Sequence, residues 1–159
     1  MPIDRRTVFA GSGLIVVAVV AAGVLWHEYG ALSPRADADN PRLVALGKSV
    51  YHDHCASCHG ANLEGQPNWK ERLPSGRLPA PPHDATGHTW HHADKQLFDL
   101  TKNGVAGTLP GYQSDMPAFK DVLRDDEIWA ALAYIKSTWP PDIRARQERL
   151  NQQSERGRQ

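Results

Sequence analysis

Cys55-Ala56-Ser57-Cys58-His59 holds both cysteines of the 159-residue chain, and a histidine directly follows the second one. Residues three apart lie on one face of a helical turn, so two thiols at this spacing can form thioether bonds to a single haem. The next residue is carried beneath the iron, where its imidazole serves as proximal ligand. The stretch therefore predicts one covalent haem c, attached through Cys55 and Cys58 and ligated by His59.

Three other interpretations of the cysteines are weaker. A thioredoxin-like pair needs a βαβ context, which does not follow here. A structural zinc site needs two further Cys or His at ligand spacing. A plain disulfide between residues three apart leaves His59 unexplained.

Length and charge narrow the class further. A chain of this length suggests one globular domain with appendages. The 18 Lys and Arg balance the 18 Asp and Glu, which gives no support for a nucleic-acid partner. The single Cys-x-x-Cys-His and the absence of an internal repeat predict one haem.

The N-terminal segment predicts a membrane anchor. Residues 8–26 carry no charge, and as a helix they would be about 28 Å long, close to the hydrocarbon thickness of a bilayer. Arg5 and Arg6 precede this segment, which by the positive-inside rule leaves residues 1–7 in the cytoplasm. The rest of the chain would then lie in the periplasm, tethered to a bacterial inner membrane.

A cleaved signal peptide is the competing interpretation of this segment. Ala36-Asp37-Ala38 has the small-x-small residue types of a cleavage site, but it lies ten residues beyond Trp26. The apolar stretch is also longer than a signal peptide requires. An uncleaved anchor is therefore favoured over removal of residues 1–38.

Beyond the anchor, the pattern predicts helices separated by long loops. Residues 27–40 form a polar linker, and Asn40-Pro41 begins a helix that runs to about His54. Residues 60–120 contain seven glycines and seven prolines, too many for long regular elements. One helix is expected within them, capped by Thr89 and ended after Asn103.

A last clear helix is expected from Asp126 to Thr138, where apolar residues follow one helical stripe. Asp125 is the expected cap, and the prolines at 140 and 141 end the helix. The polar residues 140–159 are expected to form a solvated helix or to be disordered. A globular part of about 100 residues with this much loop buries little by itself, so the apoprotein is expected to fold poorly.

Three separated pieces of the chain resemble class I, monohaem c-type cytochromes of the membrane-anchored bacterial type. These pieces are Gly47 to Gly60, Ser114 to Phe119, and Asp126 to Lys136. The resemblance covers residues 41–139 and implies an all-α class I cytochrome c fold, with three to four helices and long loops that wrap the haem, here preceded by the single transmembrane helix. In that fold the first and last helices cross, and Gly47 is expected to face Tyr134.

Met116 is the expected distal ligand of the iron. The only other methionine is the initiator, and Met116 lies 57 residues after His59 in an Asp-Met-Pro turn that resembles the ligand loop of the family. The alternative is a methionine that fills a gap in the core. A thioether favours ferrous iron, so a His/Met pair raises the reduction potential and leaves no open site. This coordination predicts electron transfer and not catalysis.

Further residues are expected around the haem. His59 should donate its other ring nitrogen to a backbone carbonyl. The resemblance implies that a proline supplies it, and the candidates are Pro79, Pro81 and Pro82. Candidate hydrogen-bond donors to the haem propionates are Trp69, Arg77 and Trp90.

Four histidines fall within ten residues: His83, His88, His91 and His92. Imidazole clusters can bind copper, zinc or nickel. No acidic or cysteine partner stands at a matching spacing, so the favoured interpretation is that these are capping and surface residues around the haem edge.

Together these features predict a periplasmic one-electron carrier that is not an enzyme. The expected partners are a quinol-oxidising complex or dehydrogenase as donor and a terminal oxidase or reductase as acceptor. Three alternatives stay open. They are a haem-based sensor or peroxidase in which Met116 leaves the iron, a metal-handling protein that uses the His83–His92 cluster, and a permanent subunit of a larger oxidase.

Overall fold

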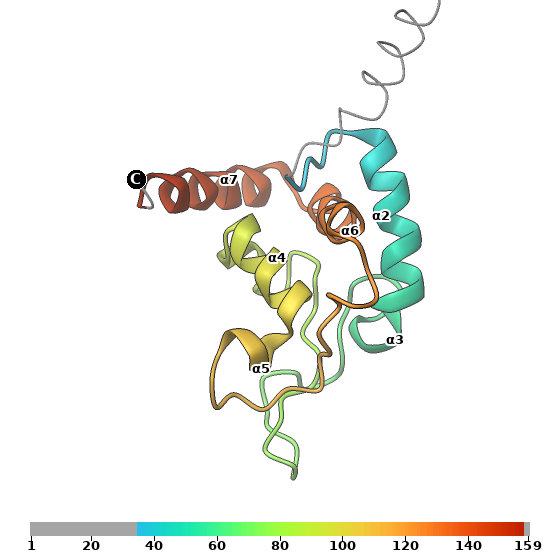
Figure 1. Ribbon diagram of the computed structural model, residues 1–159, viewed down its shortest axis with the longest axis vertical. Coiled ribbons are helices and arrows are strands. Elements are labelled where there is room, and N and C mark those ends of the chain that lie inside the picture. The colour runs from blue at the N-terminus through green and yellow to red at the C-terminus, as the bar shows by residue number, and fades with distance from the viewer. Residues whose placement is uncertain (1–34, 158–159) are drawn as a thin grey trace, which may run out of the picture. The chain divides into compact units, whose positions relative to one another are not determined.

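The computed structural model describes residues 35–157, and these residues form helices joined by loops (Figure 1). No strand occurs among them, so the all-α fold class is confirmed for this part of the chain. The anchor expected at residues 8–26 lies outside the described residues. Among residues 35–157, no helix has the length and apolar character needed to cross a membrane. The elements in chain order are α2 (Pro41–His54), α3 (Ala56–His59), the 3-10 turn η1 (Thr89–His91), α4 (Asp94–Asn103), α5 (Val105–Thr108), α6 (Asp125–Ser137) and α7 (Pro141–Arg156).

Helix α2 has the bounds that the sequence predicts. The side-chain oxygen of Asn40 accepts hydrogen bonds from the backbone N–H groups of Arg42 and Leu43, at 3.1 and 3.2 Å, and Pro41 is the first helical residue. Such a cap satisfies N–H groups that have no partner within the helix. The buried face of the helix carries Leu43, Gly47, Val50 and Tyr51.

Helices α2 and α6 cross at Gly47 and form the centre of the core. In Figure 1, α6 is seen nearly along its axis, beside the upper half of α2. A Cβ atom at Gly47 would lie 1.8 Å from the carbonyl oxygen of Ala130, so only glycine permits this backbone approach. The expectation that Gly47 faces Tyr134 is wrong. The ring of Tyr134 instead contacts that of Tyr51, with centroids 5.5 Å apart.

The start of α6 differs by one residue from the prediction. Asp125 is the first helical residue and Arg124 holds the cap position. The backbone N–H of Arg124 donates to Oε2 of Glu127 at 2.9 Å. The three acidic residues of the first turn face the positive end of the helix, which is favourable.

The prediction of one helix from Thr89 to Asn103 is wrong at its start. Thr89 begins the short turn η1, the chain is extended at His92 and Ala93, and α4 begins only at Asp94. The hydroxyl oxygen of Thr89 lies 2.7 Å from Nδ1 of His83, so it does not act as a helix cap. The N-terminus of α4 is capped from another helix, because the backbone N–H of Asp94 donates to Oδ1 of Asn151 in α7 at 2.7 Å.

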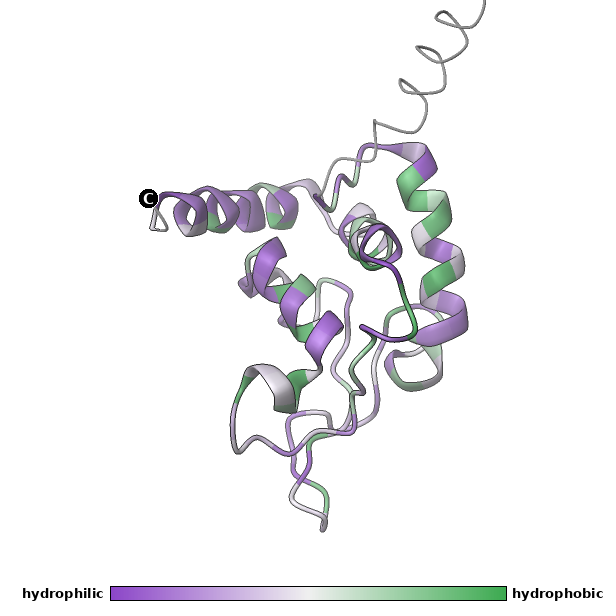
Figure 2. Ribbon diagram, viewed as in Figure 1, coloured by the Kyte–Doolittle hydropathy of each residue, from purple (hydrophilic) through white to green (hydrophobic). Residues whose placement is uncertain are grey.

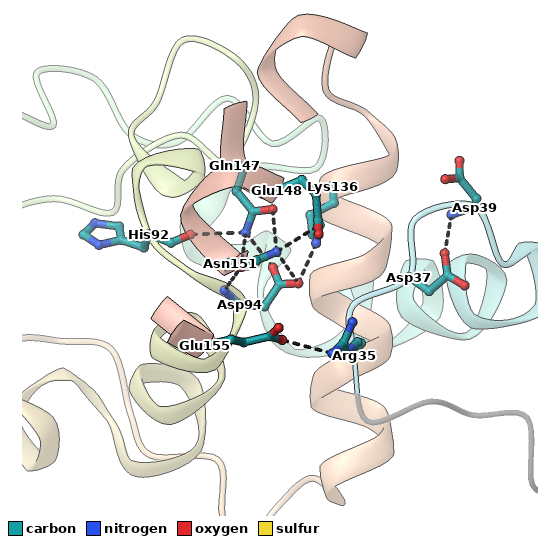
Figure 3. Close-up of polar contacts among 10 residues, drawn as sticks. All are labelled: Arg35, Asp37, Asp39, His92, Asp94, Lys136, Gln147, Glu148, Asn151 and Glu155. Carbon is teal, nitrogen blue, oxygen red and sulfur yellow. Dashed lines mark hydrogen bonds and ion pairs between the residues drawn. The ribbon is translucent and has the colours of Figure 1, made fainter. Parts of the chain in front are cut away.

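Residues 141–156 form helix α7, so of the two expectations for residues 140–159 the helix is the one found. The helix is not fully solvated, however. Although nearly all of its residues are hydrophilic (Figure 2), Gln147 is completely buried. The side-chain amide of Gln147 donates to Oδ1 of Asp94 at 2.6 Å and to the carbonyl of His92 at 3.2 Å (Figure 3). This polar network holds the helix in place together with Ile143, which packs against the buried cluster that contains Ile135 and Trp139.

The network surrounds a buried ion pair. Nζ of Lys136 lies 2.6 Å from Oδ2 of Asp94, and the two side chains are 9% and 14% exposed (Figure 3). The side-chain amide of Asn151 donates to the same carboxylate oxygen at 3.0 Å. A buried charge is costly unless it is paired and its remaining lone pairs are satisfied. Gln147 and Asn151 meet that requirement for Asp94.

Replacing Asn151 by alanine is expected to destabilise the haem-loaded protein by about 1–2 kcal/mol, because α4 loses its cap and Asp94 loses one donor. Urea unfolding followed by circular dichroism measures the change. Gln152→Ala is the matched control, since Gln152 is an exposed residue of the same helix. Equal midpoints for the two variants would contradict this role of Asn151.

Candidate haem site

The two cysteines and His59 lie on a single turn. The backbone N–H groups of Cys58 and His59 both donate to the carbonyl of Cys55, at 3.1 and 2.9 Å. Cys58 is exposed and Cys55 is partly buried. Burial, helped by the nearby thiol of Cys58, raises the pKa of Cys55 to about 11. The turn therefore presents two thiols and one imidazole from adjacent positions, as attachment to one haem requires.

His59 is buried and its orientation is fixed by a backbone carbonyl. Nδ1 of His59 donates to the oxygen of Pro81 at 2.8 Å, so Pro81 is the one of the three candidate prolines in this position. Burial lowers the pKa of His59, and the hydrogen bond to Pro81 opposes this shift. The result is a neutral imidazole whose Nε2 keeps its lone pair, which is the form that binds a metal.

His83 is partly buried and packs directly against His59, so it is not simply a surface residue. The two rings are stacked, with centroids 4.0 Å apart and planes 23° apart. The carbonyl of His83 accepts a hydrogen bond from Nε1 of Trp139 at 2.7 Å. Burial, with smaller contributions from His59 and His88, keeps the pKa of His83 well below its usual value. His83 is therefore an uncharged ring that supports one side of the expected proximal ligand.

His88 provides a test of whether the site fits a haem. Its ring stacks on Trp69, with centroids 5.3 Å and planes 12° apart, and its Nδ1 is buried without a hydrogen-bond partner among the described residues. A buried ring nitrogen without a partner is rare in folded proteins. A haem propionate offers the oxygen that this nitrogen lacks, so the residues present fit the cofactor. His88 was expected to be a capping or surface residue, and no local sequence pattern distinguishes it from the other histidines.

The three candidate propionate donors have different surroundings. Trp69 stacks on His88, and Nζ of Lys70 lies 5.0 Å from the Trp69 ring centroid. Nε1 of Trp90 donates to the carbonyl of Ala85 at 3.3 Å. Arg77 forms an ion pair with Asp115.

The histidine cluster shows no metal site. Among residues 35–157 no group of three or more His, Cys, Asp or Glu side chains could hold a metal ion. His91 and His92 are instead in edge contact with aromatic neighbours, Trp90 and His88 respectively. The metal-handling alternative therefore has no support in the described part of the chain.

Met116 lies in the loop between α5 and α6. Its backbone N–H donates to Oγ of Ser114 at 3.1 Å, which closes a local turn. Its side chain is partly buried and packs against the apolar core that α2, α4 and α6 share. The loop is held after Met116 by the backbone bond from Phe119 N–H to the carbonyl of Thr101, at 3.2 Å.

Comparison with known proteins assigns the class. The family model described as cytochrome c matches residues 44–139, which is more than half of the chain. The chain therefore belongs to the cytochrome c family, and its cofactor is covalent haem c, with Cys55 and Cys58 in the attachment motif.

Several curated relatives share this part of the chain. The cytochrome c subunit of the cytochrome bc1 complex from Corynebacterium diphtheriae is 38% identical over 73 residues, covering 45% of this chain and 25% of that protein. Cytochrome c-555 of Prosthecochloris aestuarii is 33% identical over 67 residues, covering 38% of this chain and 68% of its own length. Subunit CcoP of the Cbb3-type cytochrome c oxidase of Azospirillum brasilense is 36% identical over 67 residues, covering 42% and 21%.

The similarity to the respiratory-complex subunits is confined to a segment. The match spans only about a quarter of the length of the bc1 relative and about a fifth of that of CcoP. No solved structure matches the chain significantly.

Proposed function

We propose that the protein is a one-electron carrier whose haem c is attached at Cys55 and Cys58 and ligated axially by His59 and Met116. When bound, the haem supplies an iron that changes between the ferric and ferrous states. The observation that carries the proposal is the buried, neutral imidazole of His59. It lies on the same turn as both cysteines, and its Nδ1 donates a hydrogen bond to the carbonyl of Pro81. A thioether from Met116 would fill the second axial position, so that the site exchanges electrons and does not bind a substrate.

The chain's own residues prepare such a site for electron transfer. The carbonyl of Pro81 fixes the orientation of the His59 ring through a hydrogen bond, and His83 stacks on the face of that ring. Cys55 and Ala56 of this turn pack against a buried cluster of Tyr51, Leu63, Ile135 and Trp139, which supports the turn. Little has to rearrange when the charge of the site changes by one, which is the condition for rapid electron exchange.

The proposal extends to location and partners. Residues 8–26 would anchor the protein in a bacterial inner membrane, with residues 1–7 in the cytoplasm. The linker 27–40 would lead to a periplasmic haem domain at 41–139, and α7 follows it. The donor would be a quinol-oxidising complex or dehydrogenase, and the acceptor a terminal oxidase or reductase. The names of the bc1 and Cbb3 relatives support partners in the respiratory chain.

A second candidate is a permanent subunit of such a complex. This candidate is supported by the names of the bc1 relative and of CcoP, which are both subunits of respiratory complexes. Extraction of the membrane with a mild detergent separates the two cases. A carrier that exchanges between partners would purify alone, whereas a subunit would purify with its complex.

A redox-titrated visible spectrum of the full chain, produced together with haem-attachment machinery, tests the proposal. We expect one low-spin c-type haem, a single one-electron transition and, in the ferric state, a sulfur-to-iron charge-transfer band. Reduced protein should not bind carbon monoxide at neutral pH, because both axial positions are filled. Colourless protein, or a ferric spectrum without the sulfur band, would overturn the assignment of the ligands.

A further inference from the structure

We propose that the ion pair between Arg77 and Asp115 is a latch that holds the Met116 loop closed and thereby limits dissociation of Met116 from the iron. Arg77 is then a positioning residue for the distal ligand. This inference rests on the proposed ligation by Met116.

Besides the packing of the Met116 side chain against the apolar core, the segment of residues 113–117 has few polar contacts. The bond from Met116 N–H to Ser114 is internal to the segment. Among the described residues, the only polar contact from residues 113–117 to a distant part of the chain is that between Asp115 and Arg77, 38 positions apart. Asp115 directly precedes Met116, so the pair acts where the sulfur is presented.

Arg77 lies in an exposed turn that is closed by its own hydrogen bonds. The backbone N–H of Leu73 donates to the carbonyl of Arg77 at 2.9 Å, and that of Gly76 donates to the carbonyl of Leu73 at 2.8 Å. Nη1 of Arg72 donates to the carbonyl of Gly76 at 2.6 Å. These bonds set the local conformation of the turn, and the attachment of Arg77 to the rest of the domain depends on the residues that flank the turn.

The same segment also reaches the proximal side of the site. The backbone N–H of Gln66 donates to the carbonyl of Ala80 at 2.9 Å, and the N–H of Ala80 donates to Oε1 of Gln66 at 3.1 Å. Pro81 follows immediately and accepts the hydrogen bond from His59. Residues 66–81 therefore link the carbonyl that orients His59 to the loop that carries Met116.

The size of the effect follows from exposure. The Arg77 and Asp115 side chains are 44% and 59% exposed, so the pair is partly screened by water and salt. An exposed pair of this kind is expected to change the equilibrium between bound and dissociated Met116 by about two- to fivefold. The latch adjusts ligand exchange and does not by itself decide the coordination.

The test measures imidazole binding to the ferric, haem-loaded full chain at low ionic strength. Asp115→Asn and Arg77→Gln should each increase the apparent affinity about two- to fivefold, and the double variant should show no further increase. Exchanging the charges, with Arg77→Asp and Asp115→Arg together, should restore the parent affinity. Added salt should raise imidazole affinity in the parent and have little effect on Asp115→Asn.

Asp121→Asn is the matched control, because Asp121 is an exposed carboxylate in the same α5–α6 loop and forms no ion pair among the described residues. If the parent lacks the sulfur-to-iron band, ligation by Met116 and the latch both fail. If the parent has the band but Asp115→Asn binds imidazole as the parent and the control do, the latch alone is overturned.

Discussion

Replacing Met116 by alanine is expected to lower the reduction potential of the haem and to open the iron to carbon monoxide. Alanine has no donor for the distal position, and the thioether that favours ferrous iron is lost. The shift should be a sizeable fraction of the ~0.8 V over which axial ligands set haem potentials. Redox titration and carbon monoxide difference spectra measure the two changes.

Leu109→Ala is the control for this substitution, since it truncates an exposed apolar residue of the same loop without removing a ligand. Its potential and its spectra should equal those of the parent. A Met116→Ala protein that keeps the parent potential and excludes carbon monoxide would show that another residue is the distal ligand.

Replacing Gly47 by alanine is expected to destabilise the fold by about 3 kcal/mol or more, at the upper end of the range for overpacked cores. The added Cβ would meet backbone atoms of Ala130 in α6, and these cannot move aside as the end of a side chain can. The gain in helix propensity from glycine to alanine is only about 1 kcal/mol, so the steric clash dominates. The yield of haem-loaded protein and its urea midpoint should both fall.

Gly107→Ala provides the comparison. A Cβ at Gly107, in the short helix α5, would have ordinary contact with the nearest atom, at 3.7 Å in Asn103. This variant should be as stable as the parent or slightly more stable. Equal stability of the Gly47→Ala and Gly107→Ala proteins would mean that the α2–α6 crossing tolerates a wider separation than the structure has.

Local patterns were sufficient for the helices that carry or support the cysteines. The Asn40-Pro41 start of α2 and the apolar stripe of α6 both depend on neighbouring residues; α2 has the predicted bounds, and α6 begins and ends one residue earlier than predicted. The attachment motif is likewise a local feature, and the family comparison agrees with it.

Non-local contacts account for the expectations that failed. Thr89 has the residue type of a helix cap, but its hydroxyl is engaged by His83, and the cap of α4 comes from Asn151, 57 positions away. The packing of α7 depends on Gln147, a residue that hydrophobic patterns treat as solvated. The burial of His83 and His88 follows from the rings stacked on them, His59 and Trp69.

The dependence of Asp94 on α7 has a consequence for how the chain can be divided. The segment that matches the family ends at residue 139, yet the carboxylate of Asp94, which pairs with Lys136 within that segment, accepts hydrogen bonds from Gln147 and Asn151, which follow it. Helix α7 also contacts the segment that precedes α2, through ion pairs of Arg144 with Asp39 and of Glu155 with Arg35. A fragment that ends at residue 139 would lose the hydrogen bonds to Asp94 and the ion pairs to Arg35 and Asp39. The unit that folds together therefore extends to the end of α7.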